Sequence, residues 1–306
     1  MKNEFDVIII GGGPAGYTAA MYTVRSGFST LVIEQMAAGG QMNETVQIDN
    51  FPGFDEGIDG FSLGMKMQNG AQRFGAETLY GEVKSVELAG RIKKVETDDG
   101  VYTAKAVIIA TGAGHKHLGV DHESELVGRG VGYCASCDGM FYRGKTVAVV
   151  GGGNSAAADA LVLSRIAKKV HLIHRRDVLR ATKVYHEPLM RAENVQFHWN
   201  SAVDELKFDD RLTGVVLKDV RSGEEKELEL DGLFISIGRK PATELFRNQL
   251  ELDAGGYIVA GESTETNLPG VYAVGDVRTK AVRQIVTAAS DGAVAAHYVE
   301  EYLKDF

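Results

Sequence analysis

Cysteine is scarce in this sequence. The 306 residues contain two cysteines, and both lie in the segment Cys134-Ala135-Ser136-Cys137. A bond between them would close only a tight local loop, so we expect a reactive disulfide and not a staple between distant segments. In a Cys-x-x-Cys pair one thiolate is favoured and exchange with an outside disulfide is easy. Asp138 follows directly, and its carboxyl can supply or remove the proton that each thiolate step requires.

The chain lacks a second tight pair of metal ligands beside these cysteines. His115 and His117 are close enough in sequence to be imagined as the other half of a zinc site. Structural zinc sites usually need a second pair at characteristic spacing, and a His-x-His in a linker is a poor match. We therefore interpret Cys134 and Cys137 as a redox pair and predict no metal.

Long apolar runs are absent too. No stretch of eighteen apolar residues occurs, which excludes a membrane-spanning helix by the usual length criterion. The net charge is −9 and the isoelectric point is about 5.4, which argues against nucleic acid and anionic membranes as partners. The first candidate strand begins at Phe5 and leaves no room for a signal peptide. We expect a cytoplasmic protein.

Proline is rare (5 residues) whereas glycine is abundant (37 residues), as expected of a chain with many tight strand-to-helix turns. One pattern occurs twice: an apolar strand, a glycine turn, a helix and a second strand. Each copy predicts a right-handed βαβ unit on a parallel sheet. The copies run Phe5–Ile10, Gly11–Gly16, Tyr17–Ser26 and Leu31–Glu34, and then Thr146–Val150, Gly151–Ala156, Ala157–Ala167 and Val170–Ile173.

This duplication predicts an α/β fold with two Rossmann-like dinucleotide-binding domains, the second inserted in the first. The first domain is discontinuous and comprises residues 1–114 and 242–306, because the last segment is too short for a third domain. Residues 115–241 form the second domain, which carries the Cys-x-x-Cys pair. Alternating polar and apolar residues at 84–100 and 204–230 predict small antiparallel meanders.

The two glycine turns differ in the residues that follow the second strand. Glycines at these turns let the backbone approach a pyrophosphate at a helix N-terminus. In the first copy the strand ends in Glu34, whose carboxylate can accept hydrogen bonds from ribose hydroxyls. The second copy has His174, Arg175 and Arg176 there, with Arg180 four residues beyond, and cations suit a ribose 2′-phosphate. We predict an unphosphorylated adenine dinucleotide in the first domain and NADP(H) in the second. Ordinary tight turns and a solvated basic cluster are the alternatives.

Over essentially its whole length the chain resembles the low-molecular-weight, bacterial-type thioredoxin reductases. A Cys-x-x-Cys pair between two fingerprints is the specific feature, since reductases of the lipoamide dehydrogenase type place their redox cysteines in the FAD domain with wider spacing. The matching motifs are Gly11-Gly12-Gly13-Pro14-Ala15-Gly16, Gly39-Gly40-Gln41, Asn50-Phe51-Pro52-Gly53, Ala110-Thr111-Gly112, Cys134-Ala135-Ser136-Cys137-Asp138-Gly139, Gly151-Gly152-Gly153-Asn154-Ser155-Ala156, His174-Arg175-Arg176 with Arg180, Gly275-Asp276 and Arg283-Gln284.

The resemblance implies an enzyme, a homodimer, in which NADPH reduces FAD, FAD reduces the disulfide and the dithiol reduces thioredoxin, with the domains rotating between half-reactions. Cys137 would face the flavin, Cys134 would exchange with thioredoxin, and Asp138 would be the acid/base. Arg129, Met140 and Phe141 fall where thioredoxin docks. The family commonly has aromatic residues at both of the last two positions, so Met140 bears on partner preference.

The resemblance also assigns the cofactor contacts. FAD would lie in the first domain and NADPH in the second. The FAD contacts are Gly11, Gly13, Pro14, Ala15, Gly16, Glu34, Gln35, Gly40, Gln41, Asn50, Val83, Ala110, Thr111, Gly112, Gly275, Asp276, Arg283 and Gln284, and the NADPH contacts are Gly151, Gly153, Asn154, Ser155, Ala156, His174, Arg175, Arg176, Arg180 and Gly238.

Three other functions are compatible with parts of this pattern. A ferredoxin-fed reductase or flavin dithiol oxidase on the same scaffold would not need the arginine cluster. A reductase of another disulfide carrier would keep every motif. A redox sensor that binds dinucleotides without turnover would differ from the enzyme in its lack of thioredoxin reduction.

Overall fold

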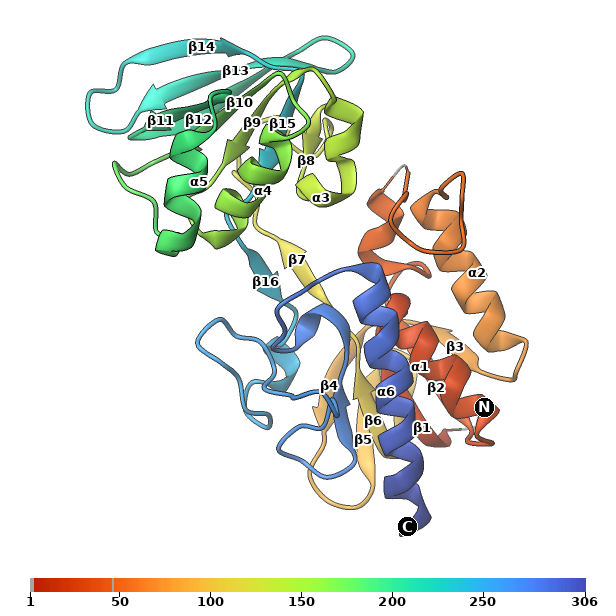
Figure 1. Ribbon diagram of the computed structural model, residues 1–306. Helices are drawn as coiled ribbons and strands as arrows, with labels where there is room; N and C mark the ends of the chain where they lie inside the picture. The colour runs from red at the N-terminus through yellow and green to blue at the C-terminus, as the bar shows by residue number, and fades with distance from the viewer. Residues whose placement is uncertain (1–2, 46) are drawn as a thin grey trace. The chain divides into compact units, whose positions relative to one another are not determined.

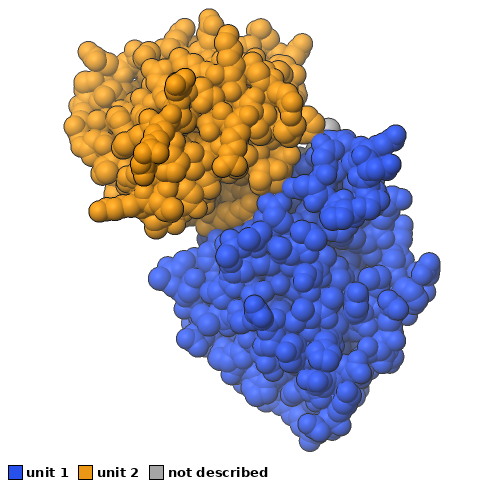
Figure 2. Space-filling view, in the orientation of Figure 1, with its two compact units in different colours: residues 1–114, 240–306 blue, residues 115–239 orange. Residues whose placement is uncertain are grey.

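The computed structural model describes residues 3–45 and 47–306, and the chain divides into two compact units. Unit 1 comprises residues 1–114 and 240–306, and unit 2 comprises residues 115–239 (Figures 1 and 2). The chain returns to unit 1 at Lys240, whereas the sequence pattern placed this return at Ala242. Among the described residues, no helix has both the length and the apolarity needed to cross a bilayer.

A mixed sheet lies at the centre of unit 1. Its strands are β1 (Glu4–Ile10), β2 (Thr30–Glu34), β3 (Glu77–Tyr80), β4 (Val83–Glu87), β5 (Lys93–Thr97), β6 (Gly100–Ile109) and β17 (Val271–Ala273). Their order is β3-β2-β1-β6-β5-β4, with β17 also paired to β6. Strands β1, β2, β3, β6 and β17 pair in parallel, whereas β4, β5 and β6 form an antiparallel meander. The register joins Ile10 to Ile33 and Ile109, so three strands end together beside the glycine turn.

Side chains of β1 alternate between the two faces of this sheet, as successive residues of a strand do. Ile8 and Ile10 pack into one apolar cluster with the meander and with segments of residues 246–277. Val7 and Ile9 pack on the other face, against α1 (Pro14–Arg25), α2 (Gly60–Gln72) and α6 (Ile285–Lys304). Helices α1 and α6 lie side by side on that face (Figure 1). Short 3₁₀ helices complete unit 1: η1 (Gly40–Glu44), η4 (Glu244–Phe246) and η5 (Gly275–Val277).

Unit 2 is built on a parallel sheet of five strands. These are β8 (Val131–Gly132), β9 (Thr146–Val150), β10 (Lys169–His174), β11 (Val195–Trp199) and β15 (Gly232–Ile235), in the order β11-β10-β9-β15-β8. One face packs against helices, and the other packs against the antiparallel sheet of β12, β13 and β14 (Figure 1). The remaining elements are α3 (Ala135–Asp138), η2 (Gly139–Tyr142), α4 (Asn154–Ser164), η3 (Lys183–Tyr185), α5 (His186–Arg191), β12 (Ser201–Phe208), β13 (Leu212–Asp219) and β14 (Glu225–Glu229).

The two passages of the chain between the units pair with each other. Strand β7 (Ala113–His115) leads out of unit 1 and β16 (Arg239–Pro241) leads back, and together they form a two-stranded sheet. Close to this sheet, the backbone N–H of Lys116 donates to the carbonyl of Gly238 at 3.1 Å. The linker thus has local structure of its own.

The predicted α/β class is confirmed, with parallel sheets and antiparallel meanders in both units. The helix boundaries differ from those read from the sequence. Helix α1 begins at Pro14 and not at Tyr17, because proline at the first helical position has a suitable φ and needs no hydrogen bond from its nitrogen. Helix α4 begins at Asn154 and ends at Ser164, where Ala157 and Ala167 were predicted. Both helices therefore begin inside the glycine motif.

Candidate active site

The first glycine turn is closely packed on one side and open on the other. Gly11 has φ +108°, and a Cβ there would lie 2.4 Å from the carbonyl oxygen of Ala110. A Cβ on Gly16 would lie 1.9 Å from the carbonyl oxygen of Gly11, so neither position accepts a side chain. Gly13 differs, because nothing lies within 4 Å of the position of its Cβ. The turn is a cradle whose open side lies at the start of α1, where free backbone N–H groups can bind a phosphate.

Glu34 lies beside this turn at the end of β2. Its Oε2 accepts a hydrogen bond from the N–H of Gly12 at 2.6 Å, and its Oε1 accepts one from the N–H of Met36 at 3.2 Å. The carboxylate has further lone pairs, which suit the hydroxyl donors of a ribose. The donor and acceptor chemistry of this corner therefore fits an adenine dinucleotide with an unmodified ribose.

Several predicted flavin contacts from distant parts of unit 1 are tied together by hydrogen bonds. Gln41 Nε2 donates to the carbonyl of Ala113 at 2.5 Å, and Thr111 Oγ1 donates to the carbonyl of Ala242 at 2.7 Å. Asn50 Nδ2 donates to Gln284 Oε1 at 3.1 Å, which joins the loop after η1 to the start of α6. Asn50 and Gln284, two of the predicted contacts, thus come together from distant parts of the sequence.

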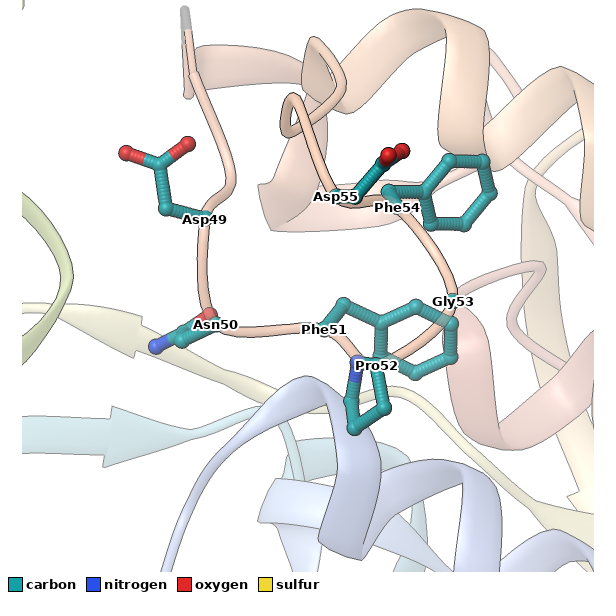
Figure 3. A pocket seen from close by; sticks show the side chains of 7 residues that line it. All are labelled: Asp49, Asn50, Phe51, Pro52, Gly53, Phe54 and Asp55. Carbon is teal, nitrogen blue, oxygen red and sulfur yellow. The ribbon is translucent and has the colours of Figure 1, made fainter.

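The loop of Asp49 to Asp55 borders an open hollow of about 500 Å³. Figure 3 shows the loop curving round this hollow, with Asn50 on one arm of the curve and Phe54 on the other. The rings of Phe51 and Phe54 lie 6.2 Å apart, centroid to centroid. Asp49 and Asp55 line the same hollow, and Phe51 and Phe54 also pack against the apolar cluster of Met42, Ile48 and Leu63, so the two rings anchor the loop to unit 1.

Arg283 lies over the ring of Tyr257, with 4.1 Å between its guanidinium carbon and the ring centroid. Its Nη2 donates to the carbonyl of Arg278 at 3.3 Å. Its Nε is buried and has no hydrogen-bond partner among residues 3–45 and 47–306. A buried donor without an acceptor is costly, so this atom is suited to a ligand that brings one.

The second glycine turn has the same packing with different neighbours. A Cβ on Gly151 would lie 2.4 Å from the carbonyl oxygen of Ser236, whereas Gly153 again has nothing within 4 Å. The carbonyl of Gly152 accepts hydrogen bonds from the N–H groups of Arg180, at 2.7 Å, and Ala181, at 3.0 Å. Asn154 Oδ1 accepts one from the N–H of Thr182 at 2.8 Å. The loop that carries Arg180 is therefore tied directly to the turn.

His174 lies under this turn and not among the exposed cations. A Cβ on Gly152 would lie 2.2 Å from His174 Cε1, and the histidine is 4% exposed. Burial, followed by the charge of Arg180, lowers the pKa of His174, which keeps the ring neutral at pH 7. Arg175, Arg176 and Arg180 are all exposed, so the positive charge beside the turn comes from three guanidinium groups. Such groups fit a terminal phosphate well.

The remaining predicted cofactor contacts occupy ends of elements. Ala110 is buried beside Gly11, whereas Val83 packs against the apolar core of unit 1. The others are Gln35, exposed after β2; Gly40, at the start of η1; Gly112, with φ +71°; Gly275 and Asp276, at the start of η5; Ser155 and Ala156, in the first turn of α4; and Gly238, with φ +110°.

Cys134 and Cys137 form a disulfide in unit 2, at the start of α3. The carbonyl of Cys134 accepts the N–H groups of Cys137, at 3.2 Å, and Asp138, at 3.1 Å. Cys134 Sγ lies 3.3 Å from Ser136 Oγ. Burial raises the pKa of Asp138 to about 6. A carboxyl that titrates near neutral pH beside a redox pair is suited to proton transfer.

Two acidic residues beside the predicted sites were missed in the sequence. Glu123 is 3% exposed and accepts hydrogen bonds from Tyr133 Oη at 2.7 Å and from the N–H of Gly119 at 2.9 Å, so it anchors the residue that precedes Cys134. Asp159 Oδ2 accepts one from Ser236 Oγ at 2.5 Å beside the second turn, and burial raises the pKa of Asp159. Asp159 is the one acid in the helix Asn154–Ser164, which is a weak signal, whereas Glu123 lies between Asp121 and Glu125 and the sequence does not single it out.

Exposed side chains follow the redox pair. Met140 is 53% and Phe141 48% exposed, and Arg129 is exposed as well, with its guanidinium bound to the carbonyl of Glu125. An exposed methionine and phenylalanine next to an exchangeable disulfide can contact a protein partner. Within the described residues, no group of three or more histidine, cysteine or carboxylate side chains is placed to hold a metal ion.

Known proteins match this chain over nearly its full length. The family described as pyridine nucleotide-disulphide oxidoreductase matches residues 5–292. A thioredoxin reductase of Streptomyces clavuligerus is 48% identical over 306 residues, which cover 99% of this chain and 95% of that protein. The chain belongs to the thioredoxin reductase family. Members of this family are flavoprotein oxidoreductases that depend on FAD and NADPH. This enzyme is therefore a flavoprotein oxidoreductase and depends on the same two cofactors.

Two solved structures of the family cover nearly the whole chain. The thioredoxin reductase of Streptococcus pyogenes is 44% identical, covers both chains completely and has a TM-score of 0.94. That of Lactococcus lactis, in the FR conformation, is also 44% identical over 99% of this chain and 100% of its own, with a TM-score of 0.69. Both relatives share the fold of this chain.

Proposed function

We propose that this enzyme is a thioredoxin-disulfide reductase, with FAD in unit 1 and NADPH in unit 2. The observation that carries this proposal is the division of chemistry between the units. Glu34 lies beside one glycine turn, whereas three arginines and the Cys134–Cys137 disulfide lie in the other unit. Full-length relatives named thioredoxin reductase support thioredoxin as the substrate.

The residues of the chain hold the cofactors and carry out the exchange. When bound, NADPH and FAD supply the two electrons that reduce the disulfide. The open sides of the turns at Gly13 and Gly153 would receive the pyrophosphates, and Arg175, Arg176 and Arg180 would hold the 2′-phosphate. The residues named above as cofactor contacts would line both sites.

The reduced pair then transfers its electrons by thiol-disulfide exchange. The Cys134 thiolate attacks one sulfur of the thioredoxin disulfide, and the other thioredoxin sulfur leaves as a thiolate and takes a proton. Cys137, as a thiolate, attacks the mixed disulfide at Cys134, which releases dithiol thioredoxin and re-forms the Cys134–Cys137 bond. Asp138 donates and accepts the protons of these steps, as its pKa of about 6 allows.

We also propose that the units rotate relative to each other during each cycle. The arginine-bearing turn and the redox pair belong to the same unit, and both must serve a flavin held by the other unit. The glycines at 112 and 238 next to the linker strands have positive φ and can absorb a hinge motion.

A homodimer and a cytoplasmic location complete the proposal. The resemblance to bacterial-type thioredoxin reductases implies the homodimer, and sedimentation of the purified enzyme would measure it. A reactive Cys-x-x-Cys pair without other cysteines is typical of reducing compartments and favours the cytoplasm.

A spectroscopic titration of the purified enzyme tests the main proposal. NADPH added without oxygen should bleach the yellow flavin, and oxidised thioredoxin should then restore the colour. Failure of NADPH to bleach the flavin would favour the ferredoxin-fed alternative. Bleaching without recovery on addition of thioredoxin would indicate another disulfide carrier or a sensor.

A further inference from the structure

Asp291 is a buried carboxylate at the centre of a charged cluster in unit 1. It lies on α6, and its side chain is 9% exposed. Its Oδ2 accepts hydrogen bonds from the N–H of Gly275 at 2.8 Å, Arg278 Nε at 2.8 Å and Lys280 Nζ at 2.9 Å. Its Oδ1 accepts a fourth from Arg278 Nη2 at 2.7 Å. One carboxylate therefore joins the helix to three positions in the loop before it.

Ion pairs of Asp291 with Arg278 and Lys280 stabilise the cluster in addition to the hydrogen bonds. Burial acts to raise the pKa of Asp291, but hydrogen bonds from Arg278 and Lys280 outweigh it and hold this pKa below its usual value. The two cationic side chains are themselves 10% and 7% exposed. Removal of the carboxylate would leave two buried cations without their counter-charge, which is strongly unfavourable.

The loop that Asp291 holds is the one that carries four predicted flavin contacts. Gly275 and Asp276 begin it, and Arg283 and Gln284 end it. Arg278 links both parts, because its side chain binds Asp291 while its carbonyl accepts Arg283 Nη2. A displaced Asp291 would therefore move both ends of the loop.

The packing of α6 places this loop against the first glycine turn. A Cβ on Gly292 would lie 2.3 Å from the carbonyl oxygen of Ala15, so α6 touches the first turn of α1 at the residue after Asp291. Gly275 has φ +72°, and its Cβ position lies 3.0 Å from Ala15 Cβ. Ala15 is thus in contact both with α6 and with the loop that Asp291 binds.

We propose that Asp291 is a positioning residue for the flavin site, which fixes the loop of residues 275–284 against the start of α1. This inference rests on the proposed binding of FAD by unit 1. Asp291 acts through Gly275, Arg278 and Lys280. It is a determinant of FAD affinity that lies outside the glycine and arginine motifs.

The test compares Asp291→Asn with Asp6→Asn, a partly exposed carboxylate of the same unit. Asp6 accepts hydrogen bonds from Lys105 Nζ at 2.8 Å and from the N–H and Oγ of Ser29, at 2.9 and 2.8 Å, at the start of β1. Both carboxylates thus bind a lysine and a backbone amide, but only Asp291 contacts the loop. The dissociation constant of FAD, from fluorescence quenching on the full chain, and the melting temperature are measured for each.

Asp291→Asn should weaken FAD binding about tenfold or more, because a hydrogen bond to a charged group is worth about that factor. Asp6→Asn should lower the melting temperature and change the FAD dissociation constant less than about twofold. Asp291→Glu keeps the charge but displaces the carboxylate, so it should fold and still bind FAD more weakly than wild type.

Two results would contradict the positioning role of Asp291, and a third would contradict the proposed binding of FAD by unit 1. Wild-type affinity in both Asp291→Asn and Asp291→Glu would overturn the positioning role. Equal weakening by Asp6→Asn would also overturn it, because affinity would then follow stability alone. A wild-type chain that folds and binds no FAD would instead contradict the proposed function of unit 1.

Discussion

The glycine turns of the two units share a backbone and differ in the side chain beside their second glycine. In unit 1 the Glu34 carboxylate accepts the N–H of Gly12, which places a negative charge at the turn. In unit 2 the neutral ring of His174 lies under Gly152, and the charge comes from the exposed arginines beyond it. The residues at the end of the strand and just beyond it thus set the sign of charge that a dinucleotide meets.

The units also differ in what is added to the shared βαβ layout. Unit 2 carries the redox pair, whereas unit 1 carries the loop held by Asp291. If this division is functional, substitutions in one unit should affect one cofactor or one half-reaction and leave the other intact. The substitutions below test whether each unit serves one cofactor or one half-reaction.

The largest effect is expected at the redox pair. Cys134→Ser or Cys137→Ser should reduce thioredoxin turnover to the background of the assay, because exchange needs both sulfurs. Reduction of FAD by NADPH should continue, since hydride transfer uses no thiol. Stopped-flow absorbance of the flavin measures this step, and a coupled thioredoxin assay measures the other. Normal turnover in either variant would refute the assignment.

Replacement of Asp138 should have the next largest effect on catalysis. Asp138→Asn should slow thiol-disulfide exchange about a hundredfold, which is a typical contribution of a positioned acid/base. In the wild-type enzyme the exchange rate should change with an apparent pKa of about 6, because burial raises the pKa of this carboxyl to about 6, and the variant should lack that transition. An unchanged pH profile would show that another group transfers the proton.

The same substitution should raise stability at neutral pH. The folded state favours neutral Asp138, so its contribution to stability is present below the usual pKa of 3.8 and is lost as the pH rises through about 6. At pH 7 the buried charge costs on the order of 2–3 kcal/mol, at about 1.4 kcal/mol for each pKa unit. Denaturant unfolding should find Asp138→Asn more stable than wild type at pH 7 and no more stable below pH 4.

The arginine cluster should distinguish NADPH from NADH. Arg175→Ala or Arg180→Ala should raise the KM for NADPH about tenfold to a hundredfold, because a charge-assisted bond to phosphate is lost. The KM for NADH should barely change. Arg221→Ala is the matched control: it removes an exposed arginine that pairs with Asp177 at 2.6 Å in the same unit. Equal losses with both cofactors would mean that the cluster does not read the 2′-phosphate.

The duplicated βαβ layout is predictable from the sequence because apolar strands and glycine turns are local patterns. The helix starts at Pro14 and Asn154 are not, since the glycine turn and the helix start share the same residues. His174 was counted among cations because its burial under Gly152 is a tertiary contact. Asp291 gave no signal, because its contacts with Gly275, Arg278 and Lys280 are tertiary and lie 11 to 16 residues away in the sequence.

The smallest effect is expected at Gly13 and Gly153, whose Cβ positions have no neighbour within 4 Å. These two glycines also give the sharpest test that each unit serves its own cofactor. Gly13→Ala and Gly153→Ala add a methyl group where nothing lies within 4 Å, at φ −78° and −94°, which alanine adopts readily. Stability should change by less than about 0.5 kcal/mol, because lower chain entropy offsets a poorer helix cap. Affinity should fall about fivefold, roughly 1 kcal/mol, for FAD alone in Gly13→Ala and for NADPH alone in Gly153→Ala, since the methyl group occupies the phosphate cradle.

Gly12→Ala, whose Cβ would lie 2.9 Å from Glu34 Oε2, should instead disturb the turn itself. Calorimetric titration of both variants with both cofactors measures all four affinities, and a loss that crosses from one unit to the other would contradict the separation.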